Sequence, residues 1–275
     1  MTSLLRAEWL KLRTTAVPWV LTAIALLINA LFVLTIFLTR NGSANAGSGG
    51  GFGGGGGGVV VAPPNAGYLI PHTTQQLRNV VGSGLPDFIF ALLLGTLMVT
   101  TEFRHKTVTT SFLVTPRRPQ MVGAKLVTAA LLGAGLAVVM VAGSLLGGGL
   151  TLVARGGSFS ALARQIPAVA PGMLLVFALF AILGVGVGSV LTNQVAAIIV
   201  VLGWFLIVEN ILVGLVHSAL RWVPSGAASA AASVSRGRAA TFGLFSWWEG
   251  ALLMLGYGLA FAFIGSLVLG QRDIT

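Results

Sequence analysis

The chain has 275 residues, of which 56% are hydrophobic and only 8% are charged, and its net charge is +10. With a mean hydropathy of +0.95, it is too apolar for an ordinary soluble domain and too long for a single membrane span, so we predict a multi-pass membrane protein. The Lys and Arg residues are scattered between apolar runs, which argues against a nucleic-acid-binding face. The absence of cysteine excludes disulfides and thiolate chemistry.

The first expected element, in residues 1–16, is an amphipathic helix lying at the cytoplasmic membrane surface. The stretch "SLLRAEWLKLR" places Leu5, Trp9 and Leu12 at helical spacing, with Arg6 and Arg13 beside them. Simple electrostatic anchoring explains part of the same pattern. A cleaved signal peptide is disfavoured, because the apolar run of about 22 residues exceeds the 7 to 15 expected of a signal sequence.

Six apolar runs are long enough to cross roughly 30 Å of hydrocarbon at about 1.5 Å per residue. They lie at about 17–38, 85–101, 126–153, 169–191, 195–216 and 248–269. The second run is the shortest and the third is the longest. We therefore expect an all-α integral membrane protein that forms one transmembrane domain over residues 1–275.

The positive charges predict the orientation of these spans. An even number of spans places both termini on one side of the membrane, and that side carries Arg6, Lys11, Arg13, Arg104, Lys106, Arg117, Arg118, Lys125 and Arg272. The opposite side carries Arg40, Arg78, Arg155, Arg164, Arg221, Arg236 and Arg238. Because the first set is concentrated near the early spans, which usually dominate orientation, we expect both termini in the cytoplasm.

Two outer regions separate the spans. Residues 39–84 contain "GSGGGFGGGGGG", which no strand precedes and no Lys-containing helix follows, so it is interpreted as a flexible linker and not as a phosphate-binding loop. Residues 217–247 are too polar to span the membrane but are rich in Ala, Trp and Phe. This composition suits short interfacial or re-entrant helices, with a disordered loop as the alternative.

The cytoplasmic segment 102–125 has its own internal order. Val108 and Phe112 are four residues apart among polar neighbours, which predicts one short amphipathic helix. The sequence "TPRRP" then ends this helix, because Pro116 and Pro119 each disfavour a helical conformation of the residue before them, Thr115 and Arg118. The segment is therefore expected to form a compact knob on the cytoplasmic face.

At this point the chain resembles the permease subunit of an ABC-2 type ABC transporter. The opening "RAEWLKLRTT" at residues 6–15 is similar to the usual start of that family, and "EFRHKTVTTSFLVTPRRPQMVGAKL" at 102–126 is similar to its loop after the second span. The six spans and the semi-polar segment before the last span also fit. The long polyglycine outer loop departs from the compact connection of the family.

The resemblance implies a bacterial cell-membrane permease that works as a homodimer, or with a related permease, and carries two cytoplasmic ATPase subunits. ATP and Mg²⁺ would bind to those partners, and this chain would be a translocation subunit without enzymatic activity of its own. In the family, the segment between spans two and three is the coupling helix that docks into the ATPase. Carried over by position, the docking residues are Glu102, Arg104, Lys106, Thr107, Thr110, Phe112, Arg117 and Arg118.

Three polar residues inside the spans are candidates for a transport pathway. Glu209 and Asn210 lie in the fifth span, where an acid costs roughly 2.5 to 3.5 kcal/mol and should face the protein interior or a water-filled cavity. Contact with substrate, proton relay and a structural hydrogen bond all remain open for Glu209. Asn29 in the first span is either a pathway residue or an interhelical hydrogen-bonding group.

Other motifs favour structural roles. Asp87 follows Pro86 at the start of the second span, where a carboxylate is expected to cap a helix. The glycines of "GVGVG" at 184–188, together with Gly203, predict close helix packing. No G-x-x-x-x-G-K-[ST] motif occurs, and the three histidines have no metal-binding or catalytic spacing.

The sequence therefore favours a permease that exports a drug-like, lipid-like or other amphipathic compound and is driven by a separate ATPase through residues 102–118. Its partners would be the ATPase, a second permease and membrane lipids, without nucleic acid. Two alternatives remain open. One is a proton-coupled secondary transporter that uses Glu209, and the other is a membrane immunity or scaffold protein that transports nothing.

Overall fold

The computed structural model of the chain describes residues 15–38, 74–105, 118–154, 156–191, 193–234 and 243–271. Within these ranges every regular element is a helix, which confirms the all-helical prediction. Elements η2 and η4 are 3₁₀-helices, and η3 is a π-helical turn. In chain order the elements are α2 (Ala16–Leu38), α3 (Thr74–Val81), η2 (Leu85–Asp87), α4 (Phe88–Arg104), α6 (Arg118–Ala154), α7 (Phe159–Ala163), α8 (Ile166–Val190), α9 (Gln194–Gly203), η3 (Trp204–Val208), α10 (Glu209–Leu215), η4 (His217–Arg221), α11 (Pro224–Ala231) and α13 (Trp247–Gln271).

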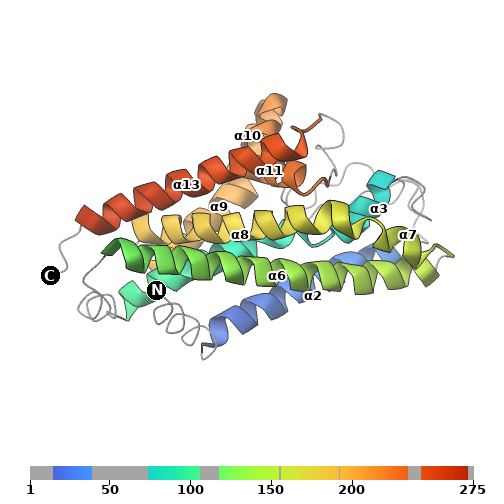
Figure 1. The fold of residues 1–275 in the computed structure, drawn as a ribbon, viewed down its shortest axis with the longest axis horizontal. Helices are drawn as coiled ribbons and strands as arrows, with labels where there is room; N and C mark the ends of the chain where they lie inside the picture. The colour runs from blue at the N-terminus through green and yellow to red at the C-terminus, as the bar shows by residue number, and fades with distance from the viewer. Residues whose placement is uncertain are drawn as a thin grey trace.

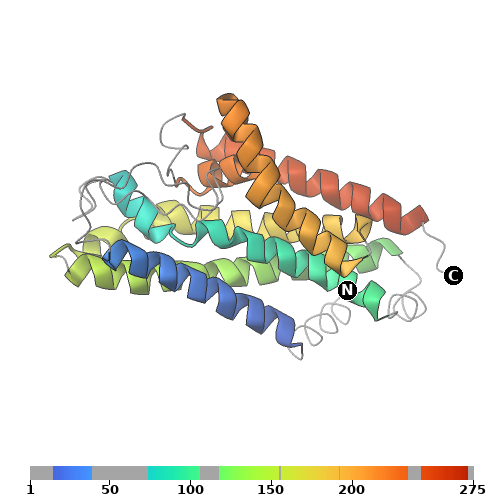
Figure 2. The same cartoon turned by 180° about the vertical axis from the view of Figure 1, so that it is seen from behind.

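The long helices run back and forth between the two ends of an elongated bundle (Figure 1). One end holds the start of α2, the end of α4, the start of α6, the end of α8, the start of α9 and the end of α13, as the two opposite views show (Figures 1 and 2). Successive long helices therefore alternate in direction, as consecutive membrane spans must.

Apolar surface covers the outside of the bundle. Leu146 and Leu150 of α6 and Leu215 of α10 are 76%, 73% and 78% exposed. Such surface is stable in contact with lipid chains and costly in contact with water. Five helical stretches among the described residues are long and apolar enough to cross a membrane, which indicates a membrane-embedded protein: 74–104, 123–154, 166–190, 194–215 and 247–265.

Helix α8 lies at the centre and packs against α4, α6 and α13. A Cβ added at Gly95 of α4 would lie 2.0 Å from the carbonyl oxygen of Ala181, and one added at Gly184 of α8 would lie 2.1 Å from that of Leu92. No side chain fits at these distances, so the two backbones touch because glycine occupies both positions. This contact makes α4 and α8 the rigid core of the bundle.

The predicted packing role of the "GVGVG" glycines is confirmed. Gly184 and Gly188 lie against α4, and Gly186 lies against the backbone of Phe261 in α13. The same prediction is wrong for Gly203, where an added Cβ would meet no described atom within 4 Å. The buried face of α9 includes Val201, and a residue two positions later on a helix is turned about 200° away from that face.

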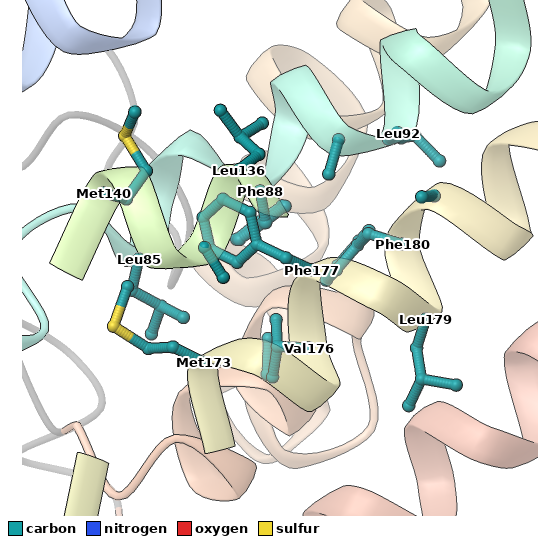
Figure 3. Close-up of a cluster of buried hydrophobic side chains, with 14 of the residues drawn as sticks. Leu85, Phe88, Leu92, Leu136, Met140, Met173, Val176, Phe177, Leu179 and Phe180 are labelled. Carbon is teal, nitrogen blue, oxygen red and sulfur yellow. The ribbon is translucent and has the colours of Figure 1, made fainter. Parts of the chain in front are cut away.

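The middle of the core is aromatic (Figure 3). Phe88 of α4 and Phe180 of α8 stack with ring centroids 4.1 Å apart. Phe205 of η3 meets these two rings edge-on at 5.5 and 5.8 Å. The contact attaches the π-helical turn to the rigid α4–α8 pair.

Helices α9 and α10 form one continuous stretch with η3 and lean away from the bundle, so that α10 stands above the other helices in both views (Figures 1 and 2). Two short helices, η4 and α11, follow in the segment that was expected to contain short helices. The residues of α11 from Ser225 to Ala231 are all buried, and the helix packs against α13 and α8. Re-entry of this segment into the membrane stays a prediction.

Several predicted boundaries are wrong. Helix α6 begins at Arg118, eight residues before the predicted span, so Arg118 is helical despite the following Pro119. A proline in the first turn removes no intrahelical hydrogen bond, which is why the helix can begin there. Thr74–Val81 forms α3 where a glycine-rich loop was expected, because the apolar side of this amphipathic stretch packs against α6 and α8. The predicted interfacial helix of residues 1–16 lies almost entirely outside the described residues.

Candidate functional site

The predicted coupling residues lie at the end of the bundle where α4 ends and α6 begins. Glu102 and Arg104 belong to the last turn of α4, and not to a separate coupling helix, while Arg118 is the first residue of α6. The structure thus narrows the connecting segment from 102–125 to 105–117. The remaining predicted residues lie outside the described part of the chain: Lys106, Thr107, Thr110, Phe112 and Arg117.

A buried ion pair crosses the base of this connecting segment. The Nζ atom of Lys125 in α6 lies 2.6 Å from Oε1 of Glu102 in α4, and the two side chains are only 6% and 11% exposed. Removing one partner of such a pair leaves an uncompensated charge, which typically costs about 3 to 5 kcal/mol. The pair therefore holds the end of α4 against the start of α6.

A second contact ties α9 to the same place. Arg104 Nη1 donates a hydrogen bond to Oε1 of Gln194 at 3.1 Å. The neighbouring Asn193 caps α9, since its Oδ1 accepts hydrogen bonds from the backbone N–H groups of Val195 and Ala196 at 3.0 and 3.2 Å. The ends of α4, α6 and α9 are thus joined into one braced unit.

The sequence did not identify Lys125 and Gln194 as parts of this site. Lys125 was counted only as a charge that sets the membrane orientation, and Gln194 was not singled out. An acid and a lysine on opposite sides of the connecting segment, both near predicted span ends, were the available signal. Their pairing depends on how α4 and α6 pack, which local sequence does not specify.

Glu209 is a helix-capping residue in the structure. The residue is 2% exposed, and Oε1 accepts hydrogen bonds from the backbone N–H of Ser225, at 3.1 Å, and from the Ser225 hydroxyl. Ser225 lies in the first turn of α11, where a negative charge is stabilised by the unpaired N–H groups and the helix dipole. Oε2 has no hydrogen-bond partner among the described residues.

Asn210 stabilises the π-helical turn. Its Nδ2 donates hydrogen bonds to the carbonyl oxygens of Phe205 and Leu206 at 3.1 and 3.0 Å. A π-helical turn leaves backbone groups without the usual partners of an α-helix, and the amide supplies a donor to them. Asn210 therefore has a structural role in the helical stretch 194–215.

Asn29 faces a different part of the bundle. It is 3% exposed and lies beside Gly84 and the carboxyl of Asp87. Helix α2, which carries Asn29, and helix α10, which carries Glu209, lie on opposite sides of the bundle (Figures 1 and 2). The three candidate pathway residues are therefore not brought together at one site.

The predicted capping role of Asp87 is wrong. Asp87 is the residue before α4, yet its side chain makes no capping hydrogen bond to that helix. It is 5% exposed, and its carboxyl instead faces Asn29 of α2. The interhelical contact has replaced the local cap that the Pro-Asp pattern predicts.

Comparison of the chain with protein-family models and with curated proteins finds no match. The functional proposal consequently rests on the braced end of α4, α6 and α9 and on the sequence resemblance described above.

Proposed function

We propose that this chain is the membrane-spanning subunit of an ATP-driven exporter of amphipathic compounds, moved by a separate ATPase that docks at residues 105–117. The observation that carries the proposal is the buried Glu102–Lys125 ion pair at the base of this segment. It would fasten the helices at the two ends of the segment to each other, so that a push on the segment moves α4 and α6 together. In this proposal α2 is the sixth span, and the braced end faces the bacterial cytoplasm.

The burial of the pair supports a mechanical role over simple membrane anchoring. A lysine that only sets orientation carries a net charge at the membrane surface. Lys125 is 6% exposed, and Glu102 neutralises it. Its position therefore contributes rigidity where a mechanical load would enter, and little to the net charge of that face.

The packing of the bundle offers a route for the motion. Closure of two ATPase subunits on ATP would push the connecting segments, and the braced ends of α4, α6 and α9 would move together. The glycine contacts between α4 and α8 would pass this displacement to the core, because touching backbones cannot slide without moving one another. ATP and Mg²⁺ belong to the partner, since the chain lacks a P-loop sequence.

The test is ATP-driven export by the complex with the ATPase encoded beside this gene, reconstituted in vesicles. We expect Lys125→Ala to retain the ATPase but to lose most coupling between ATP hydrolysis and transport. The exchanged pair Glu102→Lys with Lys125→Glu should recover part of that coupling. Thr128→Ala, which removes only a buried hydrogen bond to the carbonyl of Ala124 in the same helix, is the control and should have a small effect.

A docking test accompanies the transport test. Phe112→Ala and Arg117→Glu are expected to weaken co-purification of the ATPase, because an apolar anchor and charge-assisted bonds would be lost. Full complex formation and full ATP-driven export in both variants, and in Lys125→Ala, would contradict the proposal.

One observation favours a second candidate function, proton-coupled transport through Glu209. The buried Oε2 atom has no partner among the described residues and is available to a proton. This alternative predicts transport that follows a pH gradient without ATP and disappears in Glu209→Gln. Transport by that variant at the normal rate would exclude it.

A further inference from the structure

A second group of buried polar side chains surrounds Gly84, in the turn between α3 and η2. It comprises Asn29 of α2, Ser83 of the turn, Asp87 of η2 and Ser144 of α6, which are 3%, 6%, 5% and 0% exposed. Three separate parts of the chain thus bring polar groups to one place in an otherwise apolar bundle. None of these residues has a part in the proposed coupling to an ATPase.

The geometry converges on the glycine. The N–H of Gly84 donates a hydrogen bond to Ser144 Oγ at 3.1 Å. A Cβ added at Gly84 would lie 3.0 Å from Asn29 Nδ2 and 3.4 Å from Ser144 Oγ, so α2 and α6 both reach the space beside this residue. The N–H of Asp87 bonds to the Gly84 carbonyl at 3.1 Å, which keeps Asp87 one tight turn away.

The backbone is interrupted at the same place. Within the helical stretch 74–104, the polar, amphipathic helix α3 ends at Val81, and the apolar helix α4 begins only at Phe88. Interrupted backbone within a membrane bundle is tolerated where it is buried in protein or lines an ion or substrate site. The break therefore draws attention to what the polar cluster could hold.

The cluster lacks partners for some of its groups. Ser83 Oγ is buried without a hydrogen-bond partner among the described residues, and the only side-chain neighbour that the Asp87 carboxyl has there is the uncharged amide of Asn29. Asp87 makes no capping bond, and it forms no ion pair with another described residue. A buried carboxylate without a countercharge is strongly unfavourable. A positively charged partner would remove this cost and complete the cluster.

We propose that the carboxylate of Asp87, the hydroxyls of Ser83 and Ser144 and the amide oxygen of Asn29 bind one small monovalent cation of the Na⁺ class. A 180° rotation of the Asn29 amide turns its oxygen toward Gly84, in place of the Nδ2 atom that lies there. All ligands are then oxygen atoms, which suit hard cations and not transition metals.

The charge and the packing select the ion. One carboxylate neutralises a single positive charge, whereas Ca²⁺ sites commonly supply several acidic ligands. No group of three acidic or histidine side chains comes together among the described residues. Met140 lies close to Gly84, since an added Cβ would be 2.9 Å from Met140 Cβ, so we expect the smaller Na⁺ to bind better than K⁺.

The test uses the purified full chain in detergent, without an ATPase. Thermal unfolding is followed while NaCl replaces choline chloride at constant ionic strength, with KCl in a parallel series. A ligand that binds only the folded state raises the unfolding temperature in a saturable manner. We expect such a rise with NaCl, little or none with KCl, and binding of one ²²Na⁺ per chain.

Asp87→Asn should abolish both the NaCl response and ²²Na⁺ binding. Glu209→Gln is the matched control, because it neutralises another buried acid that also lacks a cationic partner among the described residues, and it should retain both. If Asp87→Asn does not fold, Ser83→Ala is expected to lower the apparent Na⁺ affinity several-fold without changing the charge.

Equal unfolding temperatures in NaCl, KCl and choline chloride would overturn the proposal. A NaCl response that persists in both Asp87→Asn and Ser83→Ala would also overturn it. An unfolding temperature that depends on pH but not on Na⁺ would overturn it as well, since Asp87 would then bind a proton and not a cation. Each of these outcomes leaves the proposed coupling through Glu102 and Lys125 untouched, because the measurements need no partner.

Discussion

Two acidic side chains are buried inside the apolar bundle, and their surroundings are opposite. Glu209, 2% exposed, follows the π-helical turn η3 and receives two hydrogen bonds from Ser225 at the start of α11. Asp87, 5% exposed, precedes α4 and receives no capping bond from that helix. Each therefore lies where a regular helix is interrupted, but only one of them has hydrogen-bond donors from a helix start.

This difference shows that burial alone does not tell a structural acid from a binding site. In both cases the helix on which the acid lies does not reveal the role of that acid. For Glu209 the partner helix α11 supplies a positive dipole end and a hydroxyl, so the carboxylate stabilises the fold. For Asp87 the neighbouring α2 supplies only the uncharged amide of Asn29, which provides no countercharge.

The largest effect is expected from Glu209→Ala. The substitution leaves the N–H and hydroxyl of Ser225 buried without an acceptor and opens a cavity, so we expect a loss of about 3 kcal/mol of stability. Glu209→Gln keeps an acceptor oxygen for Ser225 and should lose less than half of that amount. Thermal or denaturant unfolding of the purified chain in detergent measures both. Equal losses in the two variants would show that charge, and not the capping bonds, is what α11 requires.

Asp87→Asn is expected to act in the opposite direction when Na⁺ is absent. No capping bond is lost and an uncompensated buried charge is removed, so stability should stay unchanged or rise by about 1 kcal/mol. In NaCl the unchanged chain should be more stable than Asp87→Asn, because only the original carboxylate binds the cation. The two acids would be equivalent after all if Asp87→Asn were as destabilising as Glu209→Gln in choline chloride.

Ser144→Ala tests the hydrogen bond that holds the turn of the Asp87 cluster. It leaves the buried N–H of Gly84 without its acceptor, and we expect a loss of about 1 kcal/mol in unfolding experiments. Ser189→Ala is the matched control, since Ser189 is also buried in a long helix but bonds only to the carbonyl of Val185 in its own helix. That carbonyl has a backbone partner as well, so the control should lose less than about 0.5 kcal/mol.

The sequence predicts the parts of this fold that depend on periodicity and composition. Long apolar runs located the long helices to within a few residues at most ends, and the glycines at 184–188 correctly indicated close packing of α8. These signals are local, because a helix needs only its own residues to satisfy its backbone. The sequence does not predict the start of α6 at Arg118. A helical conformation is normally disfavoured for the residue before a proline, but it is tolerated in the first turn of a helix.

The site residues depend on contacts between distant segments, which explains why sequence analysis found them incompletely. The sequence points to Glu102 but assigns its partner Lys125 to membrane anchoring, and it points to Glu209 but not to Ser225, 16 residues later. At Asp87 the local Pro-Asp pattern predicted a cap. That prediction was wrong because Asn29, on another helix, lies beside the carboxyl. In each case the acid could be recognised, but its role is decided by the neighbouring helix.

Ser83→Ala is the smallest change and the most direct test of the difference between the two acids. The Ser83 hydroxyl is buried without a partner among the described residues. Replacing it with a methyl group in choline chloride therefore removes no hydrogen bond, and stability should change by less than about 0.5 kcal/mol. In NaCl the same substitution should remove a cation ligand, so the variant should be less stable than the unchanged chain. A loss of more than about 1 kcal/mol without Na⁺ would mean that Ser83 already has a partner. The polar groups around Gly84 would then be a closed structural network like that of Glu209 and Ser225, with no place for a cation.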